Sequence, residues 1–429
     1  MNYFIQIFGC QMNISDAQRI AGLFDSQGMS AAAKPEEVDF FVAIMCSVRQ
    51  MAADRVFGLE QRIKLIKKNN PKAVTILTGC VIESDKKRFE GIFDRILNIK
   101  TLGNWPIILD LGPNLAENDY FRILPRHDQD FSSLIPISKG CDNFCSYCVV
   151  PYTRGPLVSR PANDILAEVQ RAVAGGAKEI WLLGQNVNNY HFGKINFAKL
   201  LRAVDSIPGE FWIRFTSPHP KDFNEEAVLA FAQCEKATPY LNLPIQSGDD
   251  AILKAMNRPY AVKTYTDLIK KLRAAFKNYR KGLEREIAIS TDVIVGFCGE
   301  TKLQFNNTAK IFREIRYDMA YIAEYSQRPG TAAAKLFDNV PIKEKQRRKK
   351  AIDRIVKTTA LANNKKYTQK TVEILVDSVK NGYALGKTRS YKTVKFPVSG
   401  YPAKPGDIVN VKITKVMAFG LLGKICDEK

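Results

Sequence analysis

The chain has 429 residues, 45% of them hydrophobic and 10% aromatic, so it is long enough for two or three domains with cores of their own. It contains no run of 18 apolar residues, which excludes a membrane-spanning helix. The net charge is +20, and residues 343–429 carry 21 Lys and Arg against 7 Asp and Glu, a net +14. This basic region predicts a polyanionic partner, most simply nucleic acid, with a solubilising surface as the alternative.

The first third of the chain repeats one unit, which is an apolar strand, a cysteine and an amphipathic helix. Strands are predicted at residues 3–8, 40–45 and 73–78, and helices at residues 16–28 and 50–68. This alternation predicts a parallel sheet. The apolar start lacks the basic segment and cleavage site of a signal peptide. With nine cysteines in the chain, this favours a reducing compartment, the cytoplasm.

Cys10, Cys46 and Cys80 each follow one of these strands and are 36 and 34 residues apart. Parallel strands end at one edge of a sheet, where open α/β sheets bind ligands, so the three cysteines should converge. One buried cysteine at a strand end is usually a packing residue. Three at equivalent positions instead predict an iron–sulfur cluster in a domain spanning residues 1–112. A 4Fe-4S cluster takes four thiolates, so three of them leave one iron open.

A second group of three cysteines opens the next domain, predicted at residues 130–362 after a linker at residues 110–130. Cys141, Cys145 and Cys148 form a C-x3-C-x2-C run just after a short apolar strand. A zinc knuckle is the alternative, but a fourth ligand is missing nearby. The run predicts a 4Fe-4S cluster with one open iron. It resembles the radical S-adenosylmethionine (SAM) enzymes, in which the open iron chelates SAM.

The rest of this domain continues the alternation of strands and helices. Six strands are predicted, at residues 134–137, 179–183, 211–215, 240–243, 286–294 and 319–325. They fit the partial (β/α)6 barrel of the radical SAM family, in which chemistry is placed at the strand ends. Polar residues at these ends are candidate SAM contacts, or alternatively helix caps; they are Gln185, Asn186, Asn188, Thr216, Gln246, Ser290, Asp292 and Arg328. The glycine-containing loop at residues 296–301 is predicted to approach the adenine or ribose of SAM.

The C-terminal region begins with a basic helical stretch at residues 343–366. Five short strands follow, which predict a small antiparallel barrel in a domain at residues 366–429. Basic and aromatic side chains are mixed on it, as on proteins that bind looped RNA. An ordinary core with an ordinary basic surface is the alternative. The candidate RNA contacts are Lys387, Arg389, Tyr391, Lys392 and Lys395.

From end to end, the chain resembles the radical SAM methylthiotransferases, which have a three-cysteine N-terminal domain, a radical SAM barrel and a C-terminal TRAM domain. The motifs that carry the resemblance are GCQMN at 9–13, CSVR at 46–49, TGC at 78–80, GCDNFCSYCVVPYTRG at 140–155, LLGQNVN at 182–188 and YSQRPGT at 325–331. The GCQMN and GQNVN forms are similar to the MiaB branch, which modifies tRNA. The branches that act on threonylcarbamoyl-adenosine or on a ribosomal-protein aspartate are alternatives, as is a non-catalytic iron–sulfur RNA-binding module.

The resemblance implies 2-methylthiolation of N6-isopentenyladenosine at position 37, beside the tRNA anticodon. It implies two 4Fe-4S clusters, two SAM molecules per turnover, and sulfide or polysulfide on the N-terminal cluster. The implied partners are the anticodon stem-loop, a low-potential electron donor such as flavodoxin or ferredoxin, and a sulfur-delivery system. Three barrel motifs depart from the family pattern and bear on substrate contacts; they are NLPIQSG at 242–248, GFCGET at 296–301 and TSPHP at 216–220.

Overall fold

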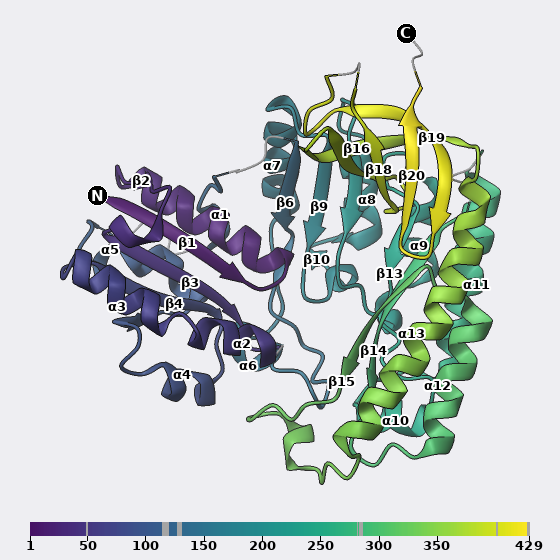
Figure 1. Cartoon of the computed structure of the whole chain (residues 1–429), viewed down its shortest axis with the longest axis horizontal. Coiled ribbons are helices and arrows are strands. Elements are labelled where there is room, and N and C mark those ends of the chain that lie inside the picture. The colour runs from purple at the N-terminus through teal and green to yellow at the C-terminus, as the bar shows by residue number, and fades with distance from the viewer. Residues whose placement is uncertain are drawn as a thin grey trace.

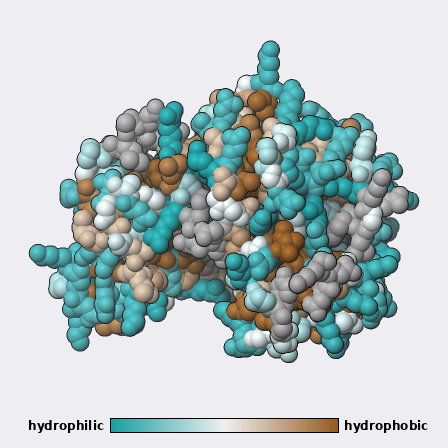
Figure 2. Space-filling model, turned by 90° about the horizontal axis from the view of Figure 1, so that it is seen from above, coloured by the Kyte–Doolittle hydropathy of each residue, from teal (hydrophilic) through white to brown (hydrophobic). Residues whose placement is uncertain are grey.

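The computed structural model describes residues 1–48, 50–113, 120–126, 131–280, 282, 286–399 and 402–426. Three parts follow one another along the chain: an N-terminal sheet domain, a larger curved sheet with outer helices, and a small β-barrel at the C-terminus (Figure 1). From above, the N-terminal domain and the rest of the molecule form two lobes that meet at a narrower waist (Figure 2). No described helix is both long and apolar enough to cross a membrane.

The N-terminal domain is a parallel sheet in the order β2-β1-β3-β4-β5, covered by helices on both faces. Its strands are β1 (Asn2–Phe8), β2 (Ser30–Ala31), β3 (Phe40–Cys46), β4 (Val74–Cys80) and β5 (Arg95–Ile96). Its helices are α1 (Gln11–Ser26), α2 (Gln50–Phe57), α3 (Glu60–Asn69), α4 (Glu83–Phe89) and α5 (Trp105–Ile108). Val42 and Ile44 of β3 pack on the α1 side, and Phe41 and Met45 on the α2 and α3 side. This explains why β3 is apolar throughout.

The helix predicted at residues 50–68 is two helices, α2 and α3, with Gly58 between them. Glycine is a poor helix former, and Ala53 and Val56 of α2 pack with Ile63 and Ile66 of α3 in one core cluster against the sheet. The predicted linker at 110–130 falls partly outside the described residues, which omit 114–119 and 127–130. Within it, Tyr120 and Phe121 are buried in the core of the N-terminal domain.

The central domain is an open barrel of six parallel strands. Its two three-stranded sheets, β6-β9-β12 and β13-β14-β15, are joined by a parallel bridge between Ile213 and Ala237. The strands are β6 (Ser132–Pro136), β9 (Glu179–Leu183), β12 (Trp212–Phe215), β13 (Tyr240–Asn242), β14 (Ala288–Val295) and β15 (Met319–Glu324). The helices are α6 (Val150–Arg154), α7 (Ala162–Ala174), α8 (Phe197–Asp205), α9 (Glu225–Gln233), α10 (Asp250–Ala255), α11 (Val262–Tyr279), α12 (Lys302–Ile315) and α13 (Ile342–Asn364). The predicted partial (β/α)6 barrel is confirmed.

The C-terminal domain is a small closed barrel in the order β16-β17-β18-β20-β19, as predicted, but it is not wholly antiparallel, because β18 and β20 pair in parallel. Its strands are β16 (Thr371–Lys380), β17 (Tyr383–Thr388), β18 (Thr393–Pro397), β19 (Ile408–Met417) and β20 (Gly420–Ile425). It sits above the strands of the central barrel (Figure 1). The guanidinium of Arg214, on β12, donates to the carbonyl oxygens of Thr388 and Arg389 at 3.0 and 2.9 Å. The Lys392 ammonium is paired with Asp318 at 2.6 Å. These contacts fix the small barrel on the large one.

The N-terminal domain is joined to the central barrel mainly through α1, which lies beside β6. The Ser15 hydroxyl donates to the carbonyl oxygen of Leu134 at 3.3 Å. Glu168 of α7 is buried between Arg19 of α1, at 3.1 Å, and Arg160, at 2.6 Å. Buried ion pairs tolerate little displacement, because separating the partners leaves an uncompensated charge. The edge of the N-terminal sheet is therefore held in a fixed position relative to the barrel.

Candidate functional site

Cys10, Cys46 and Cys80 lie together at one edge of the N-terminal sheet. Cys46 and Cys80 are direct neighbours in the parallel register of β3 and β4. Cys10 immediately precedes α1, just after β1, which is the other neighbour of β3. A side-chain hydrogen bond with Cys80, followed by burial and the charges of Cys80 and Cys10, raises the pKa of Cys46 well above its usual value. Three sulfur atoms from three strand ends therefore share one small region.

The pKa of Cys80 moves the other way, to about 6, chiefly because Cys46 donates a hydrogen bond to it and also because Arg154 lies beside it. The Arg154 Nε donates to Cys80 Sγ at 3.0 Å. Arg154 belongs to the central barrel, so its side chain crosses the boundary between the domains. A thiolate is the form of cysteine that binds metals, and this environment favours it at Cys80.

Cys141, Cys145 and Cys148 lie in a tight loop between β7 (Ser138–Lys139) and α6. Burial, and to a lesser extent the neighbouring Cys145 and Cys141, raises the pKa of Cys148 to about 12. Gly140 has a φ of +77°, and a Cβ on it would come within 1.9 Å of the carbonyl oxygen of Pro156. Only glycine fits this position, because side chains rarely adopt such a φ and the space is already occupied.

The same loop is anchored from the opposite side of the barrel. The backbone N–H of Ser146 donates to Met256 at 3.0 Å, and its hydroxyl donates to Ala255 at 2.8 Å. The Arg258 guanidinium donates to Cys145 Sγ at 3.6 Å through Nη1 and to the carbonyl oxygen of Pro244 at 3.0 Å through Nη2. The loop therefore has one fixed shape, which suits three ligands of a single group.

Within the described ranges, no three Cys, His, Asp or Glu side chains are grouped tightly enough to hold a single metal ion. A structural zinc site gathers all its ligands around one ion, whereas in a cubane cluster each thiolate binds a separate iron.

Several predicted SAM contacts lie at the strand ends beside this loop and have unused polar atoms. The side-chain oxygens of Gln185 and Gln246 are buried without a hydrogen-bond partner among the described residues. Gln246 also has a φ of +66°, a strained conformation for a residue other than glycine. Buried polar atoms are nearly always hydrogen-bonded. These orphaned acceptors therefore fit a polar ligand at this edge of the barrel.

Other predicted SAM contacts are already engaged within the barrel. Asn188 exchanges hydrogen bonds with the backbone of His219 at 2.7 and 3.0 Å, and Asn186 donates to Asp222 at 2.7 Å. Ser290 bonds Tyr240 and Asn242 at 2.8 and 2.7 Å. The Asn242 amide donates to Asp292 at 2.8 Å, and Thr216 is half-buried at the end of β12. These side chains order the strand ends, and Asn242, one of the family departures, is part of that order.

His219 was absent from the predicted site residues. Its Nδ1 accepts from the backbone of Lys221 at 3.3 Å, while its Nε2 is buried with no partner among the described residues. Burial, together with the charges of Arg258 and Lys221, lowers the pKa of His219 to about 2, so the imidazole is neutral. A neutral imidazole that accepts at Nδ1 carries its proton on Nε2, and this histidine therefore presents a donor. No sequence pattern indicates this role, because a lone histidine is usually a core residue.

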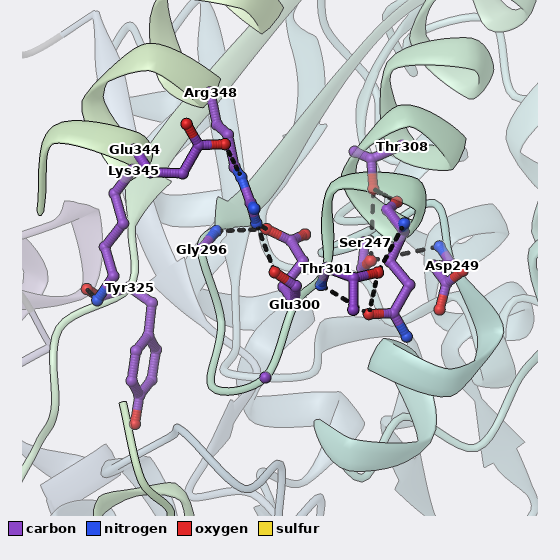
Figure 3. Close-up of polar contacts among 12 residues, drawn as sticks. Ser247, Asp249, Gly296, Glu300, Thr301, Thr308, Tyr325, Glu344, Lys345 and Arg348 are labelled. Carbon is purple, nitrogen blue, oxygen red and sulfur yellow. Dashed lines mark hydrogen bonds and ion pairs between the residues drawn. The ribbon is translucent and has the colours of Figure 1, made fainter. Parts of the chain in front are cut away.

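The loop at residues 296–301 is tied into the protein rather than left open (Figure 3). Glu300 accepts from the Gly296 backbone N–H at 2.6 Å and pairs with Arg348 of α13 at 2.6 Å. The Lys345 ammonium, also on α13, donates to the carbonyl oxygen of Tyr325 at 3.0 Å. Part of the basic stretch at 343–366 is therefore buried and holds the ends of β14 and β15. The predicted approach of this loop to SAM stays a prediction.

Arg328, a predicted SAM contact, lies against the N-terminal domain. The Arg328 guanidinium donates through Nη1 to the side-chain oxygen of Gln50 at 2.5 Å, and Arg328 is 6% exposed. Burial lowers the pKa of Arg328, while the nearby Asp85 and Cys46 act in the opposite direction. Two arginines of the central barrel, Arg154 and Arg328, thus approach the three-cysteine edge.

Four of the five predicted RNA contacts lie where the small barrel meets the large one. Tyr391 stacks on Tyr240 with ring centroids 4.6 Å apart, and Lys392 is buried on Asp318. Arg389 NH2 donates to the carbonyl oxygen of Glu235 at 2.6 Å, and the Lys387 ammonium donates to Thr393 at 2.7 Å. Lys395 is exposed, with its ammonium over the Tyr383 ring at 4.4 Å.

Exposed lysines gather instead on the outer face of β18, β20 and β19. Lys395 neighbours Leu422 across β18 and β20, Leu422 neighbours Lys415 across β20 and β19, and Lys424 lies directly opposite Lys412. Like charges directly opposite one another in a sheet are destabilising. None of the four lysines forms an ion pair with another described residue. We call Lys395, Lys412, Lys415 and Lys424 the lysine face.

Comparison with known proteins agrees with this architecture. Residues 135–312 match the family model of the Radical SAM superfamily, residues 2–98 that of Uncharacterized protein family UPF0004, and residues 365–426 that of the TRAM domain. Among solved structures, the radical S-adenosylmethionine methyltransferase TsrM from Kitasatospora setae aligns with a TM-score of 0.56 and 14% identity, over 78% of this chain and 77% of that one. This defines the fold as that of the radical SAM class, and supports an iron–sulfur cluster and SAM as cofactors.

Curated relatives narrow the assignment. The tRNA-2-methylthio-N(6)-dimethylallyladenosine synthase of Clostridium novyi (strain NT) is 38% identical, over 99% of this chain and 96% of the relative. The synthase of that name from Endomicrobium trichonymphae is 36% identical, over 99% of this chain and the whole of the relative. The chain belongs to the family of the tRNA-2-methylthio-N(6)-dimethylallyladenosine synthases. The family assignment made from the sequence motifs is confirmed.

Proposed function

We propose that this protein adds a methylthio group to C2 of N6-isopentenyladenosine at position 37 of tRNA, beside the anticodon. The observation that carries the proposal is the presence of two three-cysteine groups, one at the edge of the N-terminal sheet and one in the barrel loop, with α6 after the barrel loop in contact with β4, which ends at Cys80. A relative with this activity in its name shares the whole length of the chain. The C2–H bond of adenine is not acidic, so base catalysis is of no use and a radical enzyme is needed.

The residues present fit the cofactors that this reaction needs. Cys141, Cys145 and Cys148 would hold one 4Fe-4S cluster, and the N-terminal cysteines would hold the second. When bound, these clusters supply the electron that cleaves SAM and a carrier for sulfide or polysulfide. The unpartnered buried atoms of Gln185, Gln246 and His219 would bind polar groups of SAM.

The protein's own residues would position the reactants. Arg258 and Ser146 fix the barrel loop, so SAM would be held in one orientation. The neutral Nε2–H of His219 would donate to an acceptor of SAM without placing a second positive charge beside its sulfonium. The six-stranded barrel is open on one side, which suits a substrate as large as an anticodon loop.

The C-terminal barrel would bind the anticodon stem-loop through the lysine face, with Tyr383 available for stacking on a base. Lys387, Arg389, Tyr391 and Lys392 would act mainly by holding this barrel in place. We place the reaction in the cytoplasm, since nine free cysteines and a tRNA substrate both suit a reducing compartment. A low-potential donor such as flavodoxin or ferredoxin and a sulfur-delivery system complete the expected partners.

The test is nucleoside mass spectrometry of tRNA from cells that lack this protein and from the same cells after its gene is restored. Restoration should convert N6-isopentenyladenosine to its 2-methylthio form, and a chain with Cys141→Ala should not restore it. Methylthiolation of threonylcarbamoyl-adenosine, or of a ribosomal protein in place of tRNA, would assign the protein to another branch. Unmodified tRNA that still binds the protein would indicate a non-catalytic RNA-binding module.

A further inference from the structure

Arg154 comes from the barrel segment that follows Cys148, and a buried network of hydrogen bonds joins it to the N-terminal cysteine group. It ends α6, six residues after Cys148, yet its guanidinium lies in the N-terminal domain. Its Nε donates to Cys80 Sγ at 3.0 Å, and its Nη2 donates to the Asp16 carboxylate of α1 at 2.5 Å. The Arg154 side chain is 5% exposed and that of Asp16 is fully buried.

The network fixes where the guanidinium points. Asp16 also accepts from the Tyr120 hydroxyl at 2.7 Å and from the Asn13 amide at 3.3 Å. Asn13 in turn accepts from the backbone N–H of Cys10 at 3.2 Å. With its carboxylate held from three sides, Asp16 leaves the planar guanidinium one orientation, in which Nε faces the sulfur. A structural ion pair would need only Asp16 and Arg154, whereas this arrangement also contacts two cysteines.

We propose that Arg154 is a positioning residue that the barrel contributes to the N-terminal cysteine group, where its N–H donates to the sulfur of Cys80 and sets the reduction potential of the cluster held there. This rests on the proposed function, because it needs a cluster on Cys10, Cys46 and Cys80. A hydrogen bond to a ligating sulfur, and a positive charge beside it, both favour the reduced and more negative state. The domain that generates the radical would thereby also tune the domain that carries the sulfur.

The experiment uses the full chain with Cys141, Cys145 and Cys148 changed to Ala, so that only the N-terminal group binds iron. In this parent, Arg154→Gln should lower the midpoint potential, measured by redox titration followed by electron paramagnetic resonance. We expect about a tenfold fall in the equilibrium constant for reduction, which corresponds to about 59 mV for a one-electron couple. Arg154→Lys keeps the positive charge opposite Asp16 but loses the rigid guanidinium, which donates to Asp16 and Cys80 at once. It should also lower the midpoint potential.

Arg214→Gln is the matched control, because Arg214 is a buried arginine paired with a carboxylate, Glu179, at 2.5 Å. Among the described residues its hydrogen bonds go to Glu179, Thr238, Thr388 and Arg389 and to no cysteine, so its removal should leave the potential unchanged. If Arg154→Gln does not fold, the midpoint potential of Arg154→Lys provides the test. Iron retained at an unmoved potential in the Arg154 variants would overturn the inference alone. A parent that binds no iron would refute the N-terminal cluster of the proposed function, and the inference would fall with it.

Discussion

Buried charged side chains hold the domains of this protein in their relative positions. Arg154 and Lys392 each pair with a carboxylate of another domain, at 2.5 and 2.6 Å, whereas Arg214 pairs with Glu179 of its own domain and donates to carbonyl oxygens of the C-terminal barrel. Burying a charge is costly unless it is paired and hydrogen-bonded, so these contacts allow little movement between the domains they join. None of these roles could be predicted from the sequence, because a basic residue in a basic chain gives no sign of whether it is buried.

Asp377 is a half-buried carboxyl group whose titration we expect to affect stability. It lies at a bulge in β16, and burial raises its pKa to about 6, with Glu179 acting in the same direction and Lys387 and Arg214 opposing it. Its pKa in the unfolded chain is about 3.9, so folding favours the protonated form. Below about pH 4 the carboxyl group is protonated in both states and does not affect stability. As pH rises from about 4 to about 6, its ionisation lowers the free energy of unfolding, and above about pH 6 this loss is complete.

Asp377→Asn should therefore raise the free energy of unfolding at pH 7 by about 1–2 kcal/mol and change it little at pH 4. The measurement is urea denaturation of both chains across that pH range, comparing the difference between them. Equal stability at pH 7 would show that Lys387 and Arg214 compensate the charge fully.

Secondary-structure elements were the most predictable level of this molecule. The strands of the central barrel were predicted to within two residues, because each is a short apolar run bounded by polar residues or glycine. The convergence of Cys46 and Cys80 also followed from parallel pairing alone. The break between α2 and α3 was missed, as was the burial of Tyr391 and Lys392, which depends on contacts between domains rather than on local pattern.

The loop between β7 and α6 gives a prediction for one glycine. Gly140→Ala places a methyl group 1.9 Å from the carbonyl oxygen of Pro156 at a φ of +77°, so the loop must shift and its cysteines with it. With four irons per cubane, the reconstituted wild-type chain should hold about eight irons, and Gly140→Ala about four. In a chain with Cys10, Cys46 and Cys80 changed to Ala, which should hold about four, the same substitution should remove nearly all iron.

Gly176→Ala is the control, since Gly176 has a φ of +101° but nothing lies within 4 Å of the added Cβ. It tests strain without a clash and should leave iron content unchanged. Iron content equal to wild type in Gly140→Ala would show that the loop accommodates the methyl group. Full iron content after loss of Cys10, Cys46 and Cys80 would refute the N-terminal cluster.

At the scale of the whole molecule, the domain interfaces bring α6, which follows the barrel cysteines, into contact with β4, which ends at Cys80, and place the basic barrel at one end. The C-terminal barrel lies above the strands of the central barrel, and the N-terminal domain lies to one side of it (Figure 1). The charge distribution predicted a basic C-terminal domain. It could not distinguish the exposed lysines of the lysine face from lysines such as Lys392, which is buried and pairs with Asp318 of the central barrel.

The lysine face gives the prediction at this scale. Changing Lys395, Lys412, Lys415 and Lys424 together to Ala should weaken tRNA binding and reduce the slope of log affinity against log salt by about 0.7–0.9 for each lysine that meets a phosphate. Filter binding of tRNA across a range of salt concentrations measures both. Lys263 and Lys270 are exposed lysines of α11, 86% and 78% exposed, and changing them to Ala is the control. An unchanged slope in the fourfold variant would locate the RNA contact elsewhere.

The origin of the N-terminal cysteines from three separate strand ends also bears on how the protein matures. Cys141, Cys145 and Cys148 are within eight residues of one another, so a newly made chain can gather them before the barrel is complete. Cys10, Cys46 and Cys80 span 71 residues and meet only after β1, β3 and β4 have paired. For the cluster proposed on these three cysteines, iron delivery would therefore have to wait until the sheet has formed.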